Sequence, residues 1–561
     1  MDTREELAEN SSIAAMFLHR VRAGRHRPAL WYRESADAPF QSATWEDLLH
    51  DVYAIVRSSE EAGLYVAGDR AVQIRDNSRE WITFDLAMMM LGVWHVALNT
   101  HLALDQMVSA IQHCEPKSIV VATPQLRDRL AAICGEIPIT LSSLSNDDAS
   151  QVSTDEVLQH LEERVAGIDP NSTCTLVYTS GTTGQPKGVM LSHRNLAFDA
   201  QATVHAYDEK PVDKRLSFLP FSHLYARTCD VYTWIARGSQ LVLAFSRETI
   251  LGDCQATTPT LINGVPYFYQ KVVEGLKLSG KLDERGSLKK AFGGEIRMCA
   301  SGGAPLAKWV IDAFEKQQVS LLEGYGLTES SPVITVSTEG AHRPGSVGKP
   351  LKGVEVRATE AGEIETRGPH VMQGYYQNDE ATRQIMDGEW LRTGDLGLID
   401  DEGFLWITGR QKEILLLSTG RNVNPEALEI AIGSDPLVAQ VMVCGEGRKC
   451  LSALIVPNPD LLRQRIQEAR LWVFSKQQAL EHPTVRQWFR DILDCQLANR
   501  SDYEQVGPFT ILGQGFTPAS GELTPKLSLR RCEILKNYDA IIQQMYEPAQ
   551  VSRPWWRSWL P

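Results

Sequence analysis

Apolar segments of strand length alternate with amphipathic segments of helix length through most of this chain, and this alternation limits its fold more than any other feature. For example, the run Lys117-Ser118-Ile119-Val120-Val121-Ala122 follows a helix-like segment that ends near Cys114. Strands that alternate with helices are typical of layered α/β proteins with largely parallel strands. We therefore expect a large N-terminal domain built from layered α/β sheets.

The pattern changes near residues 345–405. Short strand-like pieces at residues 353–358, 362–366 and 403–407 stand between Gly-Asp and Asp-Gly turns, which predicts a small β-rich subdomain. Beyond Arg410 an α/β pattern resumes. We place a domain boundary at residues 410–412, so that a large domain covers 1–409 and a smaller C-terminal domain covers 410–561.

Charge and cysteine usage narrow the class of protein. The 561 residues include 56 Lys and Arg against 70 Asp and Glu, a formal net charge of −14, which argues against a generally basic nucleic-acid binder. The 10 cysteines are scattered without a C-x-x-C pair, and the acidic N-terminus has no apolar signal-peptide core, so we expect cytoplasmic residence.

The stretch 86–104 lacks Asp, Glu, Lys and Arg and has about the length of a membrane span. Its polar residues His95, Asn99 and His101 favour the alternative, a buried helix that runs into a strand.

An apolar strand that begins at Thr175 runs into a loop of small hydroxylated and glycine residues with one lysine. The sequence reads Thr179-Ser180-Gly181-Thr182-Thr183-Gly184-Gln185-Pro186-Lys187. Glycines let the backbone approach phosphate oxygens, hydroxyl and N–H groups donate hydrogen bonds, and the lysine adds a point charge. The lysine position does not fit G-x-x-x-x-G-K-[ST], so a Walker-type hydrolase is not favoured. A polyphosphate cradle is predicted here.

This loop resembles the signature of the adenylate-forming superfamily of acyl-CoA synthetases, peptide-synthetase adenylation domains and beetle luciferases. Six further segments resemble that family's motifs in its order: residues 219–223, 301–306, 323–329, 345–350, 390–395 and 409–413. The resemblance spans roughly residues 30 to 535 and is strongest to the long-chain fatty acyl-CoA synthetase branch. It implies a large adenylation domain followed by a smaller, mobile C-terminal domain.

The resemblance implies a nucleotide site and assigns its residues. The phosphates would be held by residues of the loop, namely Thr179, Ser180, Gly181, Thr182, Thr183, Gly184 and Lys187. The adenosine would be surrounded by residues of the later motifs, namely Gly302, Gly303, Ala304, Tyr325, Gly326, Asp395 and Arg410. Among these, Tyr325 would lie against the adenine, and Asp395 and Arg410 would bind the ribose hydroxyls.

Four further residues are implied to act in catalysis. Thr328 would contact the α-phosphate, and Glu329 would bind Mg²⁺, which prefers oxygen ligands. His223 would lie near the mouth of the acyl site; the alternative is a structural histidine. The family's C-terminal lysine aligns with Ser528, so we assign its role to Lys526, two residues earlier; the alternatives are Arg530 or a slow first half-reaction.

The family's two half-reactions imply a hinge at Lys412, with Gly420 in a loop that lines the thiol tunnel. We expect ATP-dependent activation of a fatty acid to acyl-AMP and transfer to CoA, with ATP, Mg²⁺ and CoA as cofactors. One alternative is a ligase that loads a carrier-protein phosphopantetheine, and another is a non-catalytic acyl or nucleotide binding protein. The Trp- and Arg-rich terminus at residues 553–561 suits peripheral contact with the inner membrane face; the alternative is a tail packed on its own domain.

Overall fold

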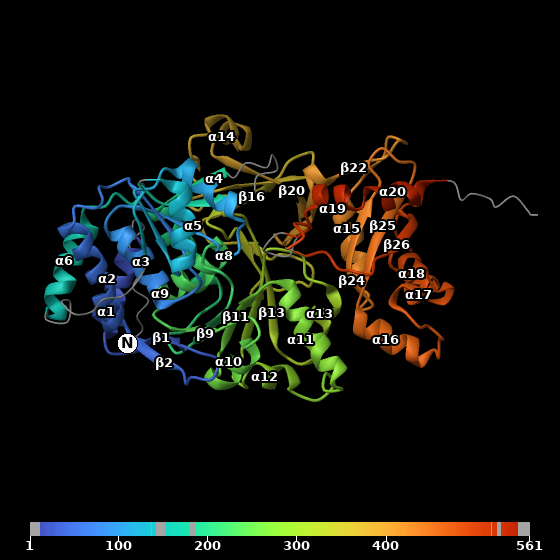
Figure 1. The fold of residues 1–561 in the computed structure, drawn as a ribbon, viewed down its shortest axis with the longest axis horizontal. Helices are drawn as coiled ribbons and strands as arrows, with labels where there is room; N and C mark the ends of the chain where they lie inside the picture. The colour runs from blue at the N-terminus through green and yellow to red at the C-terminus, as the bar shows by residue number, and fades with distance from the viewer. Residues whose placement is uncertain are drawn as a thin grey trace, which may run out of the picture. The chain divides into compact units, whose positions relative to one another are not determined.

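The computed structural model describes residues 12–135, 137–141, 152–179, 187–517, 519–523 and 529–547. The chain divides into two compact units. The first comprises Met1–Leu306, Val310–Thr393 and Leu398–Trp406, and the second comprises Ala307–Trp309, Gly394–Gly397 and Ile407–Pro561. Each unit is described by itself below, with elements labelled as in Figure 1.

A nine-stranded sheet forms one layer of the first unit. Its strands, in spatial order, are β15 (Lys349–Pro350), β14 (Thr335–Val336), β13 (Ser320–Tyr325), β12 (Met298–Ser301), β11 (Leu261–Gly264), β9 (Lys214–Ser217), β10 (Gln240–Leu243), β1 (Pro28–Tyr32) and β2 (Gln41–Thr44). The strands from β13 to β1 pair in parallel, and the sheet ends in antiparallel pairs at both edges. The central parallel strands confirm the α/β expectation.

A seven-stranded sheet carries the predicted phosphate loop. Its order is β18 (Gly374–Tyr375), β8 (Lys187–Ser192), β7 (Thr173–Thr179), β4 (Trp94–Leu98), β3 (Arg70–Ile74), β5 (Ser118–Val121) and β6 (Ile139–Leu141). The strands from β7 to β6 pair in parallel, whereas β8 runs antiparallel to both β7 and β18. Two segments far apart in sequence, β8 and β18, therefore form the edge next to the loop.

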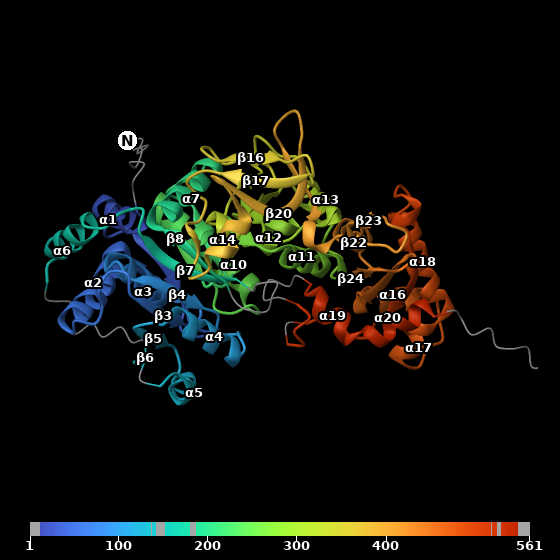
Figure 2. The same cartoon turned by 90° about the horizontal axis from the view of Figure 1, so that it is seen from above.

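Helices cover these sheets, and the sequence specifies where several of them begin. Capping boxes start α2 (Trp45–Glu61), α6 (Thr154–Ala166) and α7 (His193–Ala206), where Thr44, Ser153 and Ser192 each accept a backbone hydrogen bond. Figures 1 and 2 show α11 (Pro266–Leu278) and α13 (Lys308–Lys316) near each other, and the rings of Tyr269 and Phe314 contact across them. The helices of this unit are α1 (Ile13–Gly24), α2 (Trp45–Glu61), α3 (Arg79–Met90), α4 (Leu104–Cys114), α5 (Pro124–Cys134), α6 (Thr154–Ala166), α7 (His193–Ala206), α8 (Leu224–Ala226), α9 (Thr233–Arg237), α10 (Ile250–Thr257), α11 (Pro266–Leu278), α12 (Ser287–Ala291), α13 (Lys308–Lys316) and α14 (Asp379–Ile385).

The uncharged stretch at residues 86–104 is a buried helix followed by a strand, as predicted. In α3 every residue from Trp81 to Met90 is buried, and β4 follows after a short turn. A helix that packs on all sides needs no polar face, which explains why its last five residues, 86–90, are all apolar. Across the described ranges, no helix combines the length and the apolar character that crossing a bilayer would require.

The predicted β-rich segment forms a five-stranded sheet. Its strands are β16 (Glu355–Ala358), β17 (Glu363–Arg367), β20 (Trp390–Ile399), β19 (Met386–Asp387) and β21 (Leu405–Arg410). Figure 2 shows β16, β17 and β20 side by side. Three of these strands overlap the pieces expected from sequence, so the β-rich expectation is confirmed. The boundary expected at residues 410–412 remains a prediction.

A buried π-helical turn, η2 (Arg227–Tyr232), bonds to the seven-stranded sheet through Arg227. The Arg227 guanidinium pairs with Asp85 of α3 and donates to the Thr175 hydroxyl of β7 (2.8 Å). His95 of β4 lies 2.7 Å from the same aspartate. Burial alone would raise the pKa of Asp85, but Arg227 and His95 outweigh it and hold that pKa at about 2. The first part of β7 is therefore anchored at Thr175 by a buried network in which opposite charges balance each other.

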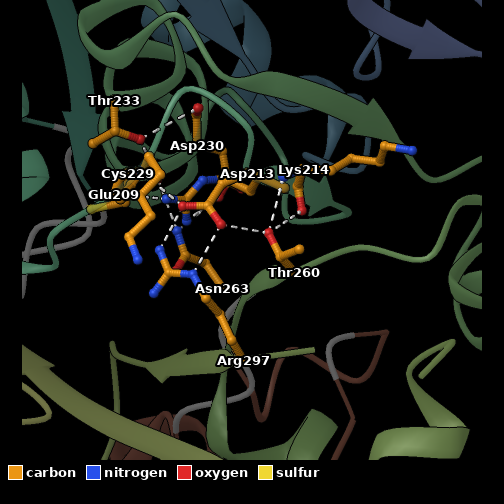
Figure 3. A network of polar contacts seen from close by, with 11 residues as sticks. Glu209, Asp213, Lys214, Cys229, Asp230, Thr233, Thr260, Asn263 and Arg297 are labelled. Atoms are coloured by element: carbon orange, nitrogen blue, oxygen red, sulfur yellow. Dashed lines mark hydrogen bonds and ion pairs between the residues drawn. The ribbon is translucent and has the colours of Figure 1, made fainter. Parts of the chain in front are cut away.

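The same turn bonds to the nine-stranded sheet through Asp230. Its carboxylate accepts hydrogen bonds from Ser217 of β9 (2.6 Å) and Asn263 of β11 (2.8 Å), and Arg215 lies 3.7 Å away. Figure 3 shows Asp230 and Asn263 in this network. One helical turn thus connects the two sheets that carry the predicted site residues.

The second unit is built around a three-stranded sheet with the order β24 (Val438–Cys444), β25 (Leu451–Pro457) and β26 (Val506–Ile511). A two-stranded ribbon of β22 (Leu415–Leu416) and β23 (Asn422–Val423) precedes it. The helices are α15 (Pro425–Gly433), α16 (Pro459–Glu468), α17 (Lys476–Glu481), α18 (Pro483–Gln496), α19 (Arg531–Asn537) and α20 (Asp539–Tyr546). Its core joins side chains of α15 and α18 to the sheet.

Candidate active site

The two ends of the predicted phosphate loop are paired with each other. Thr179, the last residue of β7, lies opposite Lys187, the first residue of β8. Residues 180–186 lie outside the described residues, and with them Ser180, Gly181, Thr182, Thr183 and Gly184, whose phosphate-binding roles stay predictions. The hairpin places the Lys187 side chain at the β18 edge of the sheet.

Lys187 and Glu329 both contact Tyr375, a residue to which we assigned no role from the sequence. The Lys187 ammonium lies 4.9 Å from the ring centroid of Tyr375, and the Tyr375 hydroxyl donates to Oε1 of Glu329 (2.7 Å). The Met372 N–H also donates to the Glu329 carbonyl (2.9 Å), which ties the glutamate backbone to the segment before β18. The structure thus brings together a predicted phosphate ligand and the predicted Mg²⁺ ligand.

Tyr325 and Thr328 lie on the approach to Glu329. Tyr325 ends β13, Thr328 begins the 3₁₀ turn η3 (Thr328–Ser330), and Gly326 lies between them. A Cβ on Gly326 would overlap the Pro332 carbonyl oxygen, so only glycine fits there. Backbone crowding therefore fixes the path from the predicted adenine contact to the predicted metal ligand.

The first of the small residues after β12, Gly302, packs against an aromatic ring. A Cβ on Gly302 would lie 3.2 Å from Tyr225 Cζ, and Gly303 has a φ of +83°. The Tyr225 hydroxyl donates to the carbonyl oxygens of Gly264 and Ala300, both at 3.4 Å. Gly302 therefore lies beside the helix that follows His223, and Gly303 and Ala304 come directly after it in the chain.

His223 stands at the start of that helix. Its N–H donates to the Pro220 carbonyl (3.0 Å), and its own carbonyl accepts from the Arg227 N–H (3.1 Å). His223 is therefore joined by a short helix both to the Arg227 network and, through Tyr225, to Gly302. Its proposed place at the mouth of an acyl site remains a prediction.

Glu323 is a buried carboxylate at the start of the motif segment 323–329. We assigned no role to this residue from the sequence. It is only 6% exposed, and its Oε2 accepts from the Gly345 N–H (3.2 Å). Burial raises its pKa to about 7, against the stabilising backbone hydrogen bonds from Gly345 and Leu306. Through Glu323, the segments 301–306, 323–329 and 345–350 contact one another.

In the second unit, the predicted ribose ligands pair with each other. Arg410 Nε lies 3.2 Å from Oδ1 of Asp395, whose side chain is nearly buried, whereas the arginine side chain is 62% exposed. The preceding Gly409 has a φ of +154°, and a Cβ there would overlap the side-chain amide of Asn424, which caps α15. The chain is closely packed directly before Lys412.

Lys412 lies in the 3₁₀ turn η4 (Gln411–Glu413) that follows β21. Gly420 has a φ of +78°, and a Cβ there would have no heavy atom within 4 Å. Lys526 and Ser528 lie outside the described residues, as do residues 553–561. Arg530, the alternative to Lys526, donates to the Gly521 carbonyl (3.2 Å). The hinge, tunnel and lysine roles stay predictions.

Glu329 is a single carboxylate that could serve as a ligand of Mg²⁺. In the described part of the chain, no group of three or more His, Cys, Asp or Glu side chains could hold a metal ion. Mg²⁺ in nucleotide sites is commonly bound by one or two carboxylates together with substrate phosphates. A single carboxylate beside a lysine fits an ion that arrives with a nucleotide.

The chain matches two models of protein families. Residues 17–376 match the AMP-binding enzyme model, and residues 412–550 match the AMP-binding enzyme C-terminal domain. The long-chain-fatty-acid–CoA ligase FadD15 of Mycobacterium bovis is 27% identical, with 96% of this chain and 98% of that protein covered. The chloroplastic long-chain-fatty-acid–[acyl-carrier-protein] ligase AEE15 of Arabidopsis thaliana is 26% identical, with 86% and 80% covered.

A solved structure extends the similarity to the fold. The crystal structure of ATP-bound MatB from Rhodopseudomonas palustris superimposes with a TM-score of 0.72 at 25% identity, with 94% of this chain and 99% of that chain covered. The α/β architecture expected from sequence is thus found in a solved relative over nearly the whole chain.

Proposed function

The chain belongs to the AMP-binding enzyme family, and on this premise we propose that it activates a fatty acid with ATP and transfers the acyl group to CoA. This family membership confirms the resemblance to the adenylate-forming superfamily, and the similar long-chain-fatty-acid–CoA ligases place the chain in its long-chain acyl-CoA synthetase branch. Long-chain specificity and the choice of CoA as the thiol are part of the proposal.

The first half-reaction needs alignment more than proton transfer. A carboxylate oxygen attacks the α-phosphorus of ATP, the bond to the leaving pyrophosphate breaks, and acyl-AMP forms. Because the acid is already ionised, no general base is required, and the enzyme's task is to orient the reactants and stabilise charge on phosphate oxygens. In the second half-reaction the sulfur of the thiol attacks the acyl carbon, AMP leaves, and the thiol proton passes to solvent.

The contact of Lys187 and Glu329 with one tyrosine is the observation that carries this proposal. The two residues come from motifs far apart in the sequence, yet each lies against Tyr375. A lysine there suits the β- and γ-phosphates, and a carboxylate suits the cation that accompanies them. When bound, Mg²⁺ would neutralise charge on the phosphates.

The remaining residues have roles in binding and orientation. Tyr325 would contact the adenine, Thr328 the α-phosphate, and Asp395 with Arg410 the ribose hydroxyls. An ionised carboxylate accepts hydrogen bonds from two neighbouring hydroxyls well, which supports the role of Asp395. We assign Lys526 to the acid and the α-phosphate during adenylation. The Lys526→Ala variant should release pyrophosphate much more slowly than wild type; near-normal release would remove Lys526 from the mechanism.

The decisive experiment measures both half-reactions. ATP–pyrophosphate exchange with fatty acids of several lengths tests the first, and thioester formation with CoA or with a holo carrier protein tests the second. We expect exchange that increases toward long acyl chains and a thioester with CoA. Transfer only to the carrier protein would favour the alternative function that AEE15 carries in its name.

A non-catalytic binding protein is the alternative from another class, and the serine at position 528 is the feature in its favour. Such a protein would bind ATP or fatty acid without forming AMP. If the purified chain, supplied with Mg²⁺ and fatty acids of all lengths, binds ATP but yields no AMP, the proposed enzyme activity is wrong.

A further inference from the structure

We propose that Tyr375 is a positioning residue that holds Glu329 through its hydroxyl and Lys187 through its ring. This inference rests on the proposed function and deepens it, because it names the residue that orients the metal-binding carboxylate and the phosphate-binding ammonium. Within the described part of the chain, the ammonium and the carboxylate both contact Tyr375 and do not pair directly with each other.

The tyrosine itself is firmly anchored. Tyr375 lies opposite Val189 in the antiparallel pair of β18 and β8, and its N–H donates to the Thr382 hydroxyl (2.9 Å). The residue is 6% exposed. The strand pairing and the Thr382 bond hold the backbone of Tyr375, and burial leaves the ring little freedom, which is what a positioning residue needs.

The chemistry of the two contacts suits opposite partners. The hydroxyl donates to a carboxylate, and a donor of this kind keeps the carboxylate negative and fixes one of its oxygens. The ring face attracts the ammonium without neutralising its charge. A phenol is protonated at neutral pH, so the Tyr375 hydroxyl is available as the donor of this hydrogen bond.

This arrangement has a functional consequence. A lysine and a glutamate that contact the same side chain would otherwise be drawn into an ion pair, which a nucleotide would have to break before using either group. With Tyr375 between them, Glu329 stays available to the cation and Lys187 to the phosphates. The hydroxyl and the ring therefore have separable effects, the first on the cation and the second on the phosphates.

The test titrates ATP into the full-length protein by isothermal titration calorimetry over a range of Mg²⁺ concentrations. Tyr375→Phe removes the hydroxyl and keeps the ring. It should raise the half-saturating Mg²⁺ concentration about tenfold, the size expected for one hydrogen bond to a charged group, and saturating Mg²⁺ should restore ATP affinity to within about twofold. Tyr375→Leu removes the ring as well and should weaken ATP binding even at saturating Mg²⁺.

Tyr376→Phe is the matched control. Tyr376 is the next residue, and its hydroxyl accepts from Gln377 (3.1 Å) rather than contacting Glu329. This variant should keep the wild-type Mg²⁺ dependence. In a Glu329→Gln background, Tyr375→Phe should change the Mg²⁺ dependence no further, because the hydroxyl acts through that carboxylate.

Three outcomes would overturn the inference. The first is a wild-type Mg²⁺ dependence in Tyr375→Phe, the second is an equal shift in Tyr376→Phe, and the third is an ATP affinity that falls equally at every Mg²⁺ concentration together with the melting temperature. Failure of the proposed function looks different. If wild type neither binds ATP with Mg²⁺ nor exchanges pyrophosphate, both the proposed function and this inference fall.

Discussion

Two aspartate–arginine pairs in this protein have opposite surroundings. In the first unit, Asp85 and Arg227 are both buried and share further hydrogen bonds with His95, Thr175 and Tyr232. In the second unit, Arg410 meets Asp395 with a side chain that is 62% exposed. The first pair fits a fixed scaffold, because a buried charge must keep its partner. The second fits a ligand site, because solvent can support the arginine while the aspartate changes partner.

The largest effect is expected where a buried partner is lost. Asp85→Ala leaves the Arg227 charge buried without its carboxylate, and it should lower the free energy of unfolding by about 3–5 kcal/mol. Urea-induced unfolding of the purified variant measures this. The double variant Asp85→Leu with Arg227→Met, which removes both charges, should recover much of the loss. If Asp85→Ala lowered the unfolding free energy by less than about 1 kcal/mol, the buried pair would be no more important for stability than the exposed pair of Asp395 and Arg410.

Glu323 sharpens the comparison because it is buried against backbone N–H groups rather than a cation. Its pKa is about 7 in the folded protein, above the ordinary glutamate value of 4.5. A raised carboxyl pKa means that the folded state holds its proton more tightly. The stability from Glu323 is therefore complete below about pH 4.5 and is lost as the pH rises through about 7.

Glutamine does not titrate, so the Glu323→Gln variant should not show this loss of stability. From pH 5 to pH 8 the unfolding free energy of the variant should fall by about 2–3 kcal/mol less than that of wild type, since one pKa unit corresponds to about 1.4 kcal/mol. Urea unfolding at the two pH values measures the difference. The control is Glu295→Gln at an exposed position of the same unit. Parallel pH dependence in Glu323→Gln and wild type would contradict the prediction.

Asp395 should show the reverse behaviour, with a large effect on the ligand and a small one on the fold. Asp395→Ala should weaken ATP binding about 10- to 100-fold, because hydrogen bonds to a charged group are lost. The unfolding free energy should change by less than about 1 kcal/mol, since Arg410 is solvated. Calorimetric titration with ATP and with 2′,3′-dideoxy-ATP gives the check. A variant that still distinguishes these two nucleotides would exclude Asp395 as the ribose ligand.

The sequence predicted the layers, the β-rich sheet and the motif segments because these depend on local patterns. Apolar alternation and turn residues marked β7, β16 and β21 within a few positions. Contacts between side chains from distant elements could not be predicted in this way. Tyr375 contacts Lys187 and Glu329 only in the folded protein, where β8, β18 and η3 lie together. The Arg227 network likewise joins a helix and two strands whose proximity is tertiary.

Lys412→Pro tests whether the second region is adaptable as well as exposed. Proline fixes φ near −65°, so a pivot at this position would lose rotational freedom, whereas Lys412→Ala removes the charge and keeps the backbone free. The expected result is about a tenfold slower thioester step in Lys412→Pro, measured from preformed acyl-AMP and CoA, with ATP–pyrophosphate exchange within about twofold of wild type. Lys412→Ala should leave both rates close to wild type. Equal losses in both half-reactions would place the pivot elsewhere, and the contrast between a fixed first region and an adaptable second one would then rest on Asp395 and Arg410 alone.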